Sequence, residues 1–169
     1  MPDCNIYLAP AEFDPQTKKR TKTAVQQINT LIIDLDYKNT DFKGMEAEQL
    51  MEYAWSRGFF EKIPCPSFCM ESSAGLGLHL IWLLDKPFVV NGDYRNINRW
   101  ERVLKAICKH FAPLGADNAC CDIGHVFRVA GTTNTKTDAT AKLLFWEELR
   151  NTEPVHYDFE AVEKPFLSS

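Results

Sequence analysis

Short apolar runs bounded by turn-forming residues dominate the first half of the chain. Apolar residues fill most of the segment from about Ile28 to Tyr37, and two further runs cover residues 67–72 and 76–84. Runs of this length are typical of β-strands. The small residues from Ser72 to Gly77 separate the second run from the third and predict a hairpin turn. The pattern therefore predicts three strands, two of them joined as a hairpin.

Helical spacing appears in two other segments. From Asp93 to Phe111 the apolar residues recur every three or four positions, and Gly92 and Asp93 provide start signals. The segment from Glu46 to Arg57 has similar spacing. Both are predicted to be helices, the first of them long enough to cover a sheet.

The remaining segments have weaker patterns. We expect a short strand at Asn5 to Pro10 and a polar, basic loop at Phe13 to Thr23. Further along, we expect a short apolar run at residues 125–131, a polar turn at 132–140 and a strand at 141–149. The tail that follows contains Pro154 and Pro165 and is only weakly patterned. Strands and helices thus mix along the chain, and the fold class is α/β or α+β.

Length and composition fit one domain covering residues 1–169. The chain is 45% hydrophobic, which is enough for a sizeable core without disulfides. A net charge of −4 argues against a uniformly basic, nucleic-acid-binding surface, although a local basic groove is compatible with it. The longest apolar runs are too short to span a membrane. Six cysteines without a secretory leader suggest reduced thiols and a cytoplasmic protein.

Two carboxylates one residue apart, Asp34 and Asp36, interrupt the most apolar strand. Residues i and i+2 of a strand share one face, so both side chains point the same way. Burying two unpaired carboxylates costs several kcal/mol, a cost that a divalent cation held by their oxygen atoms would offset. In the alternative interpretation, the strand ends at Ile33 and both aspartates are solvated or cap a turn.

A glycine-rich turn and a histidine form a second candidate site in the hairpin. Gly75 and Gly77 allow backbone amides to approach an anion, and His79 projects from the strand that leaves the turn. Such a site suits a nucleoside triphosphate. Alternatively, the glycines serve only the hairpin and His79 is a satisfied core residue.

A third candidate site lies between Gly115 and Lys136. It contains two further carboxylates, Asp117 and Asp122, followed by Arg128 and a Gly-Thr-Thr-Asn turn that ends at Lys136. A third carboxylate and two phosphate-binding cations would complete the residues needed for nucleotidyl transfer. Taken singly, these residues are equally compatible with a turn, an ion pair and a solvated loop charge.

The three segments, in this order, resemble the archaeo-eukaryotic primase superfamily, especially the primase-polymerase domains of plasmid, phage and mobile-element replication proteins. Its motifs are a hydrophobic-Asp-x-Asp/Glu strand, a small-x-His strand, and a hydrophobic-Asp upstream of an Arg-x-Pro-Gly-Thr-x-Asn-x-Lys-like turn. The match spans a motif core of about residues 28–137. It implies a catalytic core with an RRM-like antiparallel or mixed sheet, flanking helices and a smaller α/β subdomain.

Roles for individual residues follow from the resemblance by position. The metal ligands would be Asp34, Asp36 and Asp117. Asp122 is the alternative third ligand, but it lies closer to the arginine than the spacing in the family, which favours Asp117. The remaining positions would bind the nucleotide: Gly75, Gly77, His79, Arg128, Asn134 and Lys136. Two departures are Leu76, where many relatives have a polar or basic residue, and Ala130, which replaces the usual proline.

The implied activity is template-directed nucleotidyl transfer by two-metal catalysis with Mg²⁺ or Mn²⁺. The implied partners are a single-stranded DNA template, NTP or dNTP substrates, and a helicase in the same or a neighbouring protein. Structural zinc is not expected, because the cysteine spacing matches no strong zinc-finger pattern. Two alternatives remain, a metal-dependent nuclease and a non-catalytic nucleic-acid-binding replication-initiator module.

Overall fold

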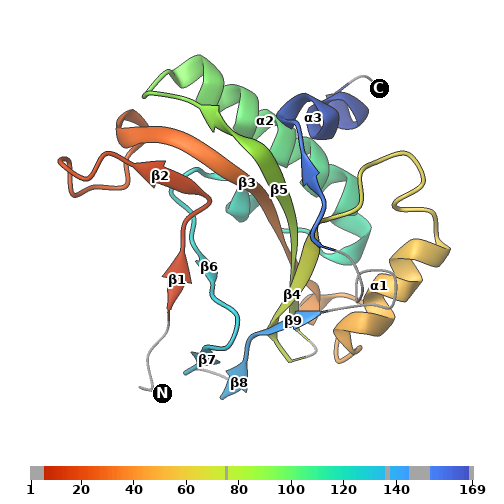
Figure 1. Ribbon diagram of the computed structural model, residues 1–169. Helices are drawn as coiled ribbons and strands as arrows, with labels where there is room; N and C mark the ends of the chain where they lie inside the picture. Colours follow the sequence, from red (N-terminus) through yellow and green to blue (C-terminus); the bar gives the residue numbers. More distant parts are fainter. Residues whose placement is uncertain (1–5, 75, 136–137, 145–152, 168–169) are drawn as a thin grey trace.

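A six-stranded sheet forms the centre of the computed structural model, which describes residues 6–74, 76–135, 138–144 and 153–167 (Figure 1). Its strand order is β2-β3-β5-β4-β9, with antiparallel neighbours throughout. A sixth strand, β10, pairs in parallel with β5 at Leu83 and Leu84. These residues follow the part of β5 that pairs with β4. The strands are β2 (Ala11–Phe13), β3 (Val25–Asp36), β4 (Phe68–Ser73), β5 (Gly77–Val89), β9 (Lys142–Leu144) and β10 (His156–Tyr157).

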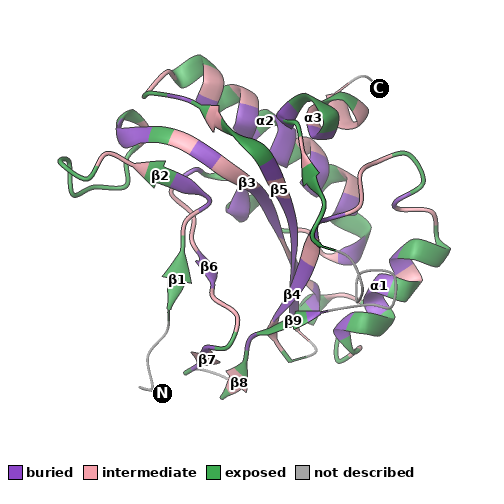
Figure 2. Ribbon diagram, viewed as in Figure 1, coloured by how far each residue is buried: buried purple, intermediate pink, exposed green. Residues whose placement is uncertain are grey.

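The two long strands, β3 and β5, separate an apolar face from a face that carries polar groups. On β3, Leu31, Ile33 and Leu35 are fully buried, whereas the alternate positions Asp34 and Asp36 are partly exposed. This alternation is the period of two that a strand imposes on its side chains. The face with Leu31, Ile33 and Leu35 therefore contributes to the core, and the opposite face carries the two aspartates. Figure 2 shows that the paired ends of β3 and β5, residues 31–35 and 77–82, are mostly buried.

Three helices accompany the sheet: α1 (Ala47–Ser56), α2 (Tyr94–Phe111) and α3 (Phe159–Leu167). Helix α2 begins after Asp93, whose carboxylate accepts a hydrogen bond from the backbone N–H of Arg95. Its apolar residues are buried, and it contacts β3, with α3 beside it (Figure 1). Arg99 of α2 forms ion pairs with Glu160 and Glu163 of α3. The two helices thus cover the sheet as one layer.

Two short ladders complete the fold outside the main sheet. β1 (Tyr7–Leu8) pairs with β6 (Phe127–Arg128), and β7 (Thr133–Asn134) pairs with β8 (Ala139–Thr140). Short 3₁₀ helices connect the elements: η1 (Lys22–Ala24), η2 (Tyr37–Asn39), η3 (Ala112–Leu114) and η4 (Asn118–Cys121). The chain therefore returns to the polar face of the sheet through η4 and β6.

Most of the expected elements are confirmed. The strand at β3, the hairpin of β4 and β5, and helices α1 and α2 lie within a few residues of their predicted bounds. Of the strand expected at 141–149, β9 covers Lys142–Leu144, and 145–149 lie outside the described residues. The weakly patterned tail contains α3, which sequence analysis missed because the helix is short and includes Pro165. No helix in the described part of the chain is long and apolar enough to cross a membrane.

Candidate active site

The pairing of β3 with β5 brings the first two candidate segments together. In the register of these strands, Asp34 lies opposite His79 and Asp36 lies opposite Gly77. Directly opposed residues of an antiparallel pair share a face, with their Cβ atoms about 5 Å apart. Both aspartates, the histidine and the glycine therefore lie on the polar face, at the end of β3 and the start of β5.

Asp34 has an unsatisfied carboxylate oxygen at the centre of this site. Its Oδ1 atom is buried without a hydrogen-bond partner among the described residues, and it lies 3.6 Å from Nε2 of His79. Burial, reinforced by Cys120, Asp36 and Asp117, raises the pKa of Asp34 from 3.8 to about 7. An unsatisfied carboxylate oxygen of this kind is suited to binding a cation.

His79 is neutral at physiological pH. Burial is the main reason, with smaller electrostatic contributions from His125 and Arg128, so that the pKa of His79 falls from 6.5 to about 3. The ring packs edge-on against Phe127, with centroids 5.2 Å apart. Asp34 and His79 are therefore not a charged pair near neutral pH, and the imidazole retains one N–H donor and one acceptor nitrogen.

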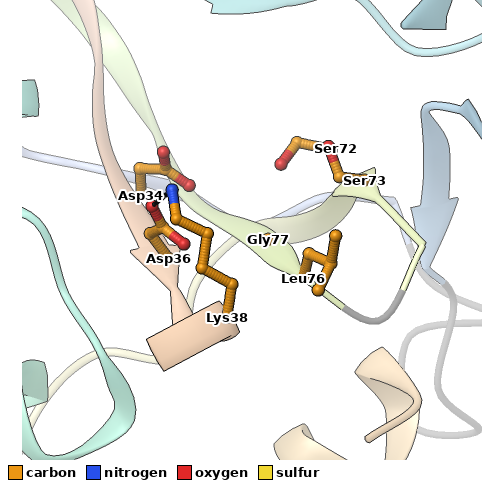
Figure 3. A pocket seen from close by; sticks show the side chains of 7 residues that line it. All are labelled: Asp34, Asp36, Lys38, Ser72, Ser73, Leu76 and Gly77. Atoms are coloured by element: carbon orange, nitrogen blue, oxygen red, sulfur yellow. Dashed lines mark hydrogen bonds and ion pairs between the residues drawn. The ribbon is translucent and has the colours of Figure 1, made fainter. Parts of the chain in front are cut away.

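Asp36 and Lys38 form the more exposed side of the site. The ammonium Nζ of Lys38 lies 2.6 Å from Oδ2 of Asp36, and Figure 3 shows the lysine side chain reaching back to the two aspartates. A pocket of about 210 Å³ opens here. Its lining comes from the ends of β3, β4 and β5: Asp34, Asp36, Lys38, Ser72, Ser73, Leu76 and Gly77.

Gly77 is required by the close approach of two strands. A Cβ atom at this position would lie 2.6 Å from Oγ of Ser72 and 3.9 Å from Oδ1 of Asp34. Any side chain would thus collide with the serine and project into the pocket beside the carboxylate. The other glycine of the predicted anion-binding turn, Gly75, lies outside the described residues.

Asp117 reaches the site through backbone pairing with β3. Its N–H donates to the carbonyl of Asp34 at 2.9 Å, and the N–H of Asp36 donates to the carbonyl of Gly115 at 2.9 Å. Gly115 has a positive φ of 91°, and a Cβ there would lie 2.8 Å from the carbonyl oxygen of Asp36. The segment therefore needs glycine to lie this close to the end of β3.

The side chains of the three aspartates are not gathered around one point. The carboxylate of Asp117 accepts a hydrogen bond from the N–H of Ala119 at 2.8 Å and caps η4. Within the described ranges, the only three His, Cys, Asp or Glu ligand atoms that lie within 4.8 Å of one another are cysteine sulfurs. A shared metal would therefore require the carboxylate of Asp117 to rotate away from its cap.

The alternative third ligand, Asp122, has a different environment. It is exposed, and its carboxylate accepts a hydrogen bond from the N–H of Gly124 at 2.8 Å. Asp117 is also exposed and accepts from the N–H two residues on, but its own backbone N–H donates to the carbonyl of Asp34 and its charge contributes to the raised pKa of Asp34. The structure thus places Asp117 beside the first aspartate pair.

Arg128 lies behind His79, in the ladder of β1 and β6. Its guanidinium donates to the carbonyl of Thr133 and to the hydroxyl of Tyr7, both at 3.2 Å, and lies 5.1 Å from the centre of the Tyr7 ring. The residue is nearly buried, at 9% exposure. Its positive charge also contributes to the lowered pKa of His79. Arg128 is therefore held in one orientation next to the site.

The predicted nucleotide-binding set includes two further residues, Asn134 and Lys136. Asn134, in β7, donates from Nδ2 to Oγ of Ser73 at 3.1 Å, which connects β7 to the pocket wall. Lys136 lies outside the described residues. The structure thus joins Asn134 to the rim of the pocket.

Sequence analysis missed three contributors to the site. Lys38 pairs with Asp36, Tyr7 holds Arg128, and Ser72 lies against Gly77. Lys38 lies in η2, beyond the end of β3, so strand alternation gave no signal for its pairing with Asp36. No local signal points to Tyr7, since its role depends on the pairing of β1 with β6.

The chain has the fold of the archaeo-eukaryotic primase-polymerase catalytic domain, and the resemblance suggested by the three motifs is confirmed at the level of the fold. The AEP domain of the cyanophage S-2L primase-polymerase superposes with a TM-score of 0.61 over 94% of this chain and 70% of that chain, at 18% identity.

Sequence comparison gives a second similar protein. A replication protein of Clostridium perfringens is 26% identical over 167 residues, which are 99% of this chain and 37% of that protein. The chain thus spans little more than a third of the length of this curated relative. No model of a protein family matches the chain.

Proposed function

We propose that this chain is a template-directed nucleotidyltransferase, a DNA primase or primase-polymerase that synthesises primers and extends them in plasmid, phage or mobile-element replication. One observation carries the proposal: strand register sets Asp34 opposite His79 and Asp36 opposite Gly77, while the backbone of Asp117 bonds to that of Asp34. The three segments that the sequence separates therefore meet at one end of β3. The fold and the similar replication protein support the same activity.

The residues present fit divalent metal ions. The orphaned Oδ1 of Asp34 and the neighbouring carboxylate of Asp36 are hard oxygen donors, the type that Mg²⁺ and Mn²⁺ prefer. In the proposal, Asp34, Asp36 and Asp117 hold the ions. Two bound ions would activate the attacking 3′-hydroxyl and stabilise the leaving pyrophosphate.

The protein itself would bind and orient the nucleotide. Gly77 leaves the space beside Asp34 open for a phosphate, because a Cβ there would fill it. The neutral ring of His79 would donate one uncharged hydrogen bond to a phosphate oxygen. Arg128, oriented by Tyr7 and Thr133, would supply positive charge where negative charge develops on the phosphates. Asn134 and Lys136 complete the nucleotide-binding set in this proposal.

Lys38 supplies a counter-charge to the carboxylate pair. Its ammonium lies on Asp36, where a metal ion would otherwise bind. An exposed ion pair of this kind contributes little to stability, so a divalent ion with its bound triphosphate can displace the lysine. The released ammonium would then be available to the triphosphate.

A primer-synthesis assay tests the proposal directly. The purified chain is incubated with a single-stranded DNA template, Mn²⁺ or Mg²⁺, and NTPs or dNTPs in separate reactions, and the products are sized. We expect dinucleotides and longer products from wild type, and a loss of at least about 100-fold in the Asp34→Asn/Asp36→Asn variant. The control is the same type of substitution at an exposed position of β5, Asp85→Asn, which should keep full activity.

The same assay separates the alternative functions. A metal-dependent nuclease would shorten a labelled template without adding nucleotides, and a non-catalytic initiator module would bind DNA without changing it. Undiminished synthesis by the double variant would show that the carboxylates are misassigned. A wild-type protein that makes no product with either metal or either sugar would refute the proposed activity.

A further inference from the structure

Three cysteine side chains meet between helix α2 and the 3₁₀ helix η4. Sγ of Cys108 lies 3.4 Å from Sγ of Cys121 and 3.7 Å from Sγ of Cys120, and all three sulfurs lie within 4.8 Å of one another. Each residue is at most 2% exposed. Cys108 belongs to the last turns of α2, whereas the other two are the final residues of η4. We call these three residues the thiol triad.

The spacing of the thiol triad matches that of sulfurs around one metal ion. Zinc–sulfur bonds of about 2.3 Å in a tetrahedron place the sulfurs about 3.8 Å apart, close to the distances of both contacts of Cys108. A disulfide would need about 2.05 Å, so all three thiols are free. Soft thiolate ligands favour Zn²⁺ over Mg²⁺ or Mn²⁺. The thiol triad therefore differs in chemistry from the carboxylate site.

The charges around the thiol triad also suit a cation. Binding Zn²⁺ would release one proton from each thiol, and the resulting cluster of three thiolates and one ion would carry a single negative charge. Lys105 lies one turn before Cys108 on α2 and acts electrostatically on Cys121. It would balance that remaining charge. The fourth coordination position would go to water or to a carboxylate oxygen.

The thiol triad lies directly behind the third candidate ligand of the carboxylate site. Sγ of Cys108 lies 3.7 Å from the carbonyl oxygen of Asp117, and the carboxylate of Asp117 caps η4, the element that carries the other two cysteines. The backbone N–H of Asp117 in turn donates to Asp34. An ion held by the thiol triad would thus fix the segment that aligns Asp117 with β3.

We propose that Cys108, Cys120 and Cys121 form a structural zinc site that fastens η4 to α2 and positions Asp117. The assignment to an ion stands independently of the proposed primase activity. Its positioning role rests on that activity, because it concerns the third carboxylate of the same site. The cysteine spacing argued against zinc because it matches no zinc-finger pattern, whereas the fold brings Cys108 and the vicinal pair together from two different elements.

Metal analysis of the full chain tests the zinc site. The protein is purified under reducing conditions, passed through metal-free buffer, and its zinc content is measured by mass spectrometry. We expect about one zinc per chain, and a thiolate-to-cobalt charge-transfer absorption when Co²⁺ replaces zinc. Zinc below about a tenth per chain, together with no such absorption, would overturn the proposal and leave three packed thiols. The cobalt spectrum needs no variant and so does not depend on whether a variant folds.

Matched variants locate the ion. Cys108→Ala and Cys121→Ser should lower zinc content at least about tenfold, whereas Cys65→Ala, a half-buried thiol outside the triad, should keep it. Zinc retained in both triad variants would contradict the assignment. Asp34→Asn/Asp36→Asn should lose primer synthesis and keep zinc. A chain without synthesis that still binds zinc would refute the proposed function alone, and a zinc-free chain that synthesises primers would refute only the zinc site.

Discussion

Replacement of Asp34 by asparagine should stabilise the metal-free protein at alkaline pH. The folded protein holds the pKa of Asp34 at about 7, whereas the unfolded chain returns it to about 3.8. Between these values the folded state binds more protons than the unfolded state, so the free energy of unfolding falls as pH rises. The penalty is complete above about pH 7 and is absent well below pH 4. Asparagine carries no charge at any of these pH values, so the variant does not incur this penalty.

The size of the effect follows from the two pKa values. The interval from 3.8 to about 7, at 1.36 kcal/mol for each pH unit, corresponds to about 4 kcal/mol. The Asp34 side chain is 29% exposed, and screening by water lowers this figure to about 2–4 kcal/mol. For a chain of this length, such a gain raises Tm by roughly 5–15 °C.

Urea denaturation in the presence of EDTA measures the prediction between pH 4 and pH 8. The variant's advantage should be small at pH 4 and grow as pH rises, and excess Mn²⁺ should remove it because a bound ion compensates the wild-type carboxylate. The acid-side cost of burying neutral His79, whose pKa falls to about 3, acts on both proteins and cancels in the comparison. Asp85→Asn, at an exposed position of β5, is the control and should show no gain at pH 8. An Asp34 variant no more stable than wild type at pH 8 would refute the reasoning.

Three further substitutions test the pocket. Gly77→Ala places a methyl group 2.6 Å from Oγ of Ser72, so we expect the free energy of unfolding to fall by about 1–3 kcal/mol. We also expect weaker dNTP binding in a thermal-shift titration with Mn²⁺. Adding Ser72→Ala should restore part of the stability. Tyr7→Phe removes the acceptor of one Arg128 hydrogen bond while keeping the ring, and should raise the KM for nucleotide by about threefold to tenfold with little change in Tm; an unchanged KM would show that the hydroxyl does not orient the guanidinium. Lys38→Met removes the ammonium group that pairs with Asp36. We expect Mn²⁺ to bind up to about fivefold more tightly, as measured by calorimetry. Weaker binding would show that the lysine does not compete with the ion.

The elements that build the site could be predicted because their signals are local. The apolar run of β3, the hairpin of β4 and β5, and the spacing along α2 each depend on residues close together in the sequence. The position of His79 beside Asp34 could not be derived from such patterns, because it depends on the register between two strands. A shift of one residue would turn the histidine into the core. The order of the motifs suggested the site, and the register supplied the geometry.

The features that escaped prediction are those that join distant segments. Helix α3 is short and contains Pro165, and its place is set by ion pairs with Arg99 and by the stacking of Phe159 on Phe88. Likewise, the contact of Tyr7 with Arg128 needs residues 121 positions apart in the chain. Neither contact has a periodic pattern in the sequence. Both arise from tertiary packing, which overrides weak local preference.

The backbone hydrogen bond between Asp117 and Asp34 has a consequence for the order in which the site is assembled during folding. The two residues are separated by the whole of β4, β5 and α2, so a chain emerging from the ribosome completes β3 long before Gly115 appears. Until that segment pairs with β3, the first two aspartates lack their third partner. The proposed site would therefore be complete only after the sheet and its long covering helix are in place.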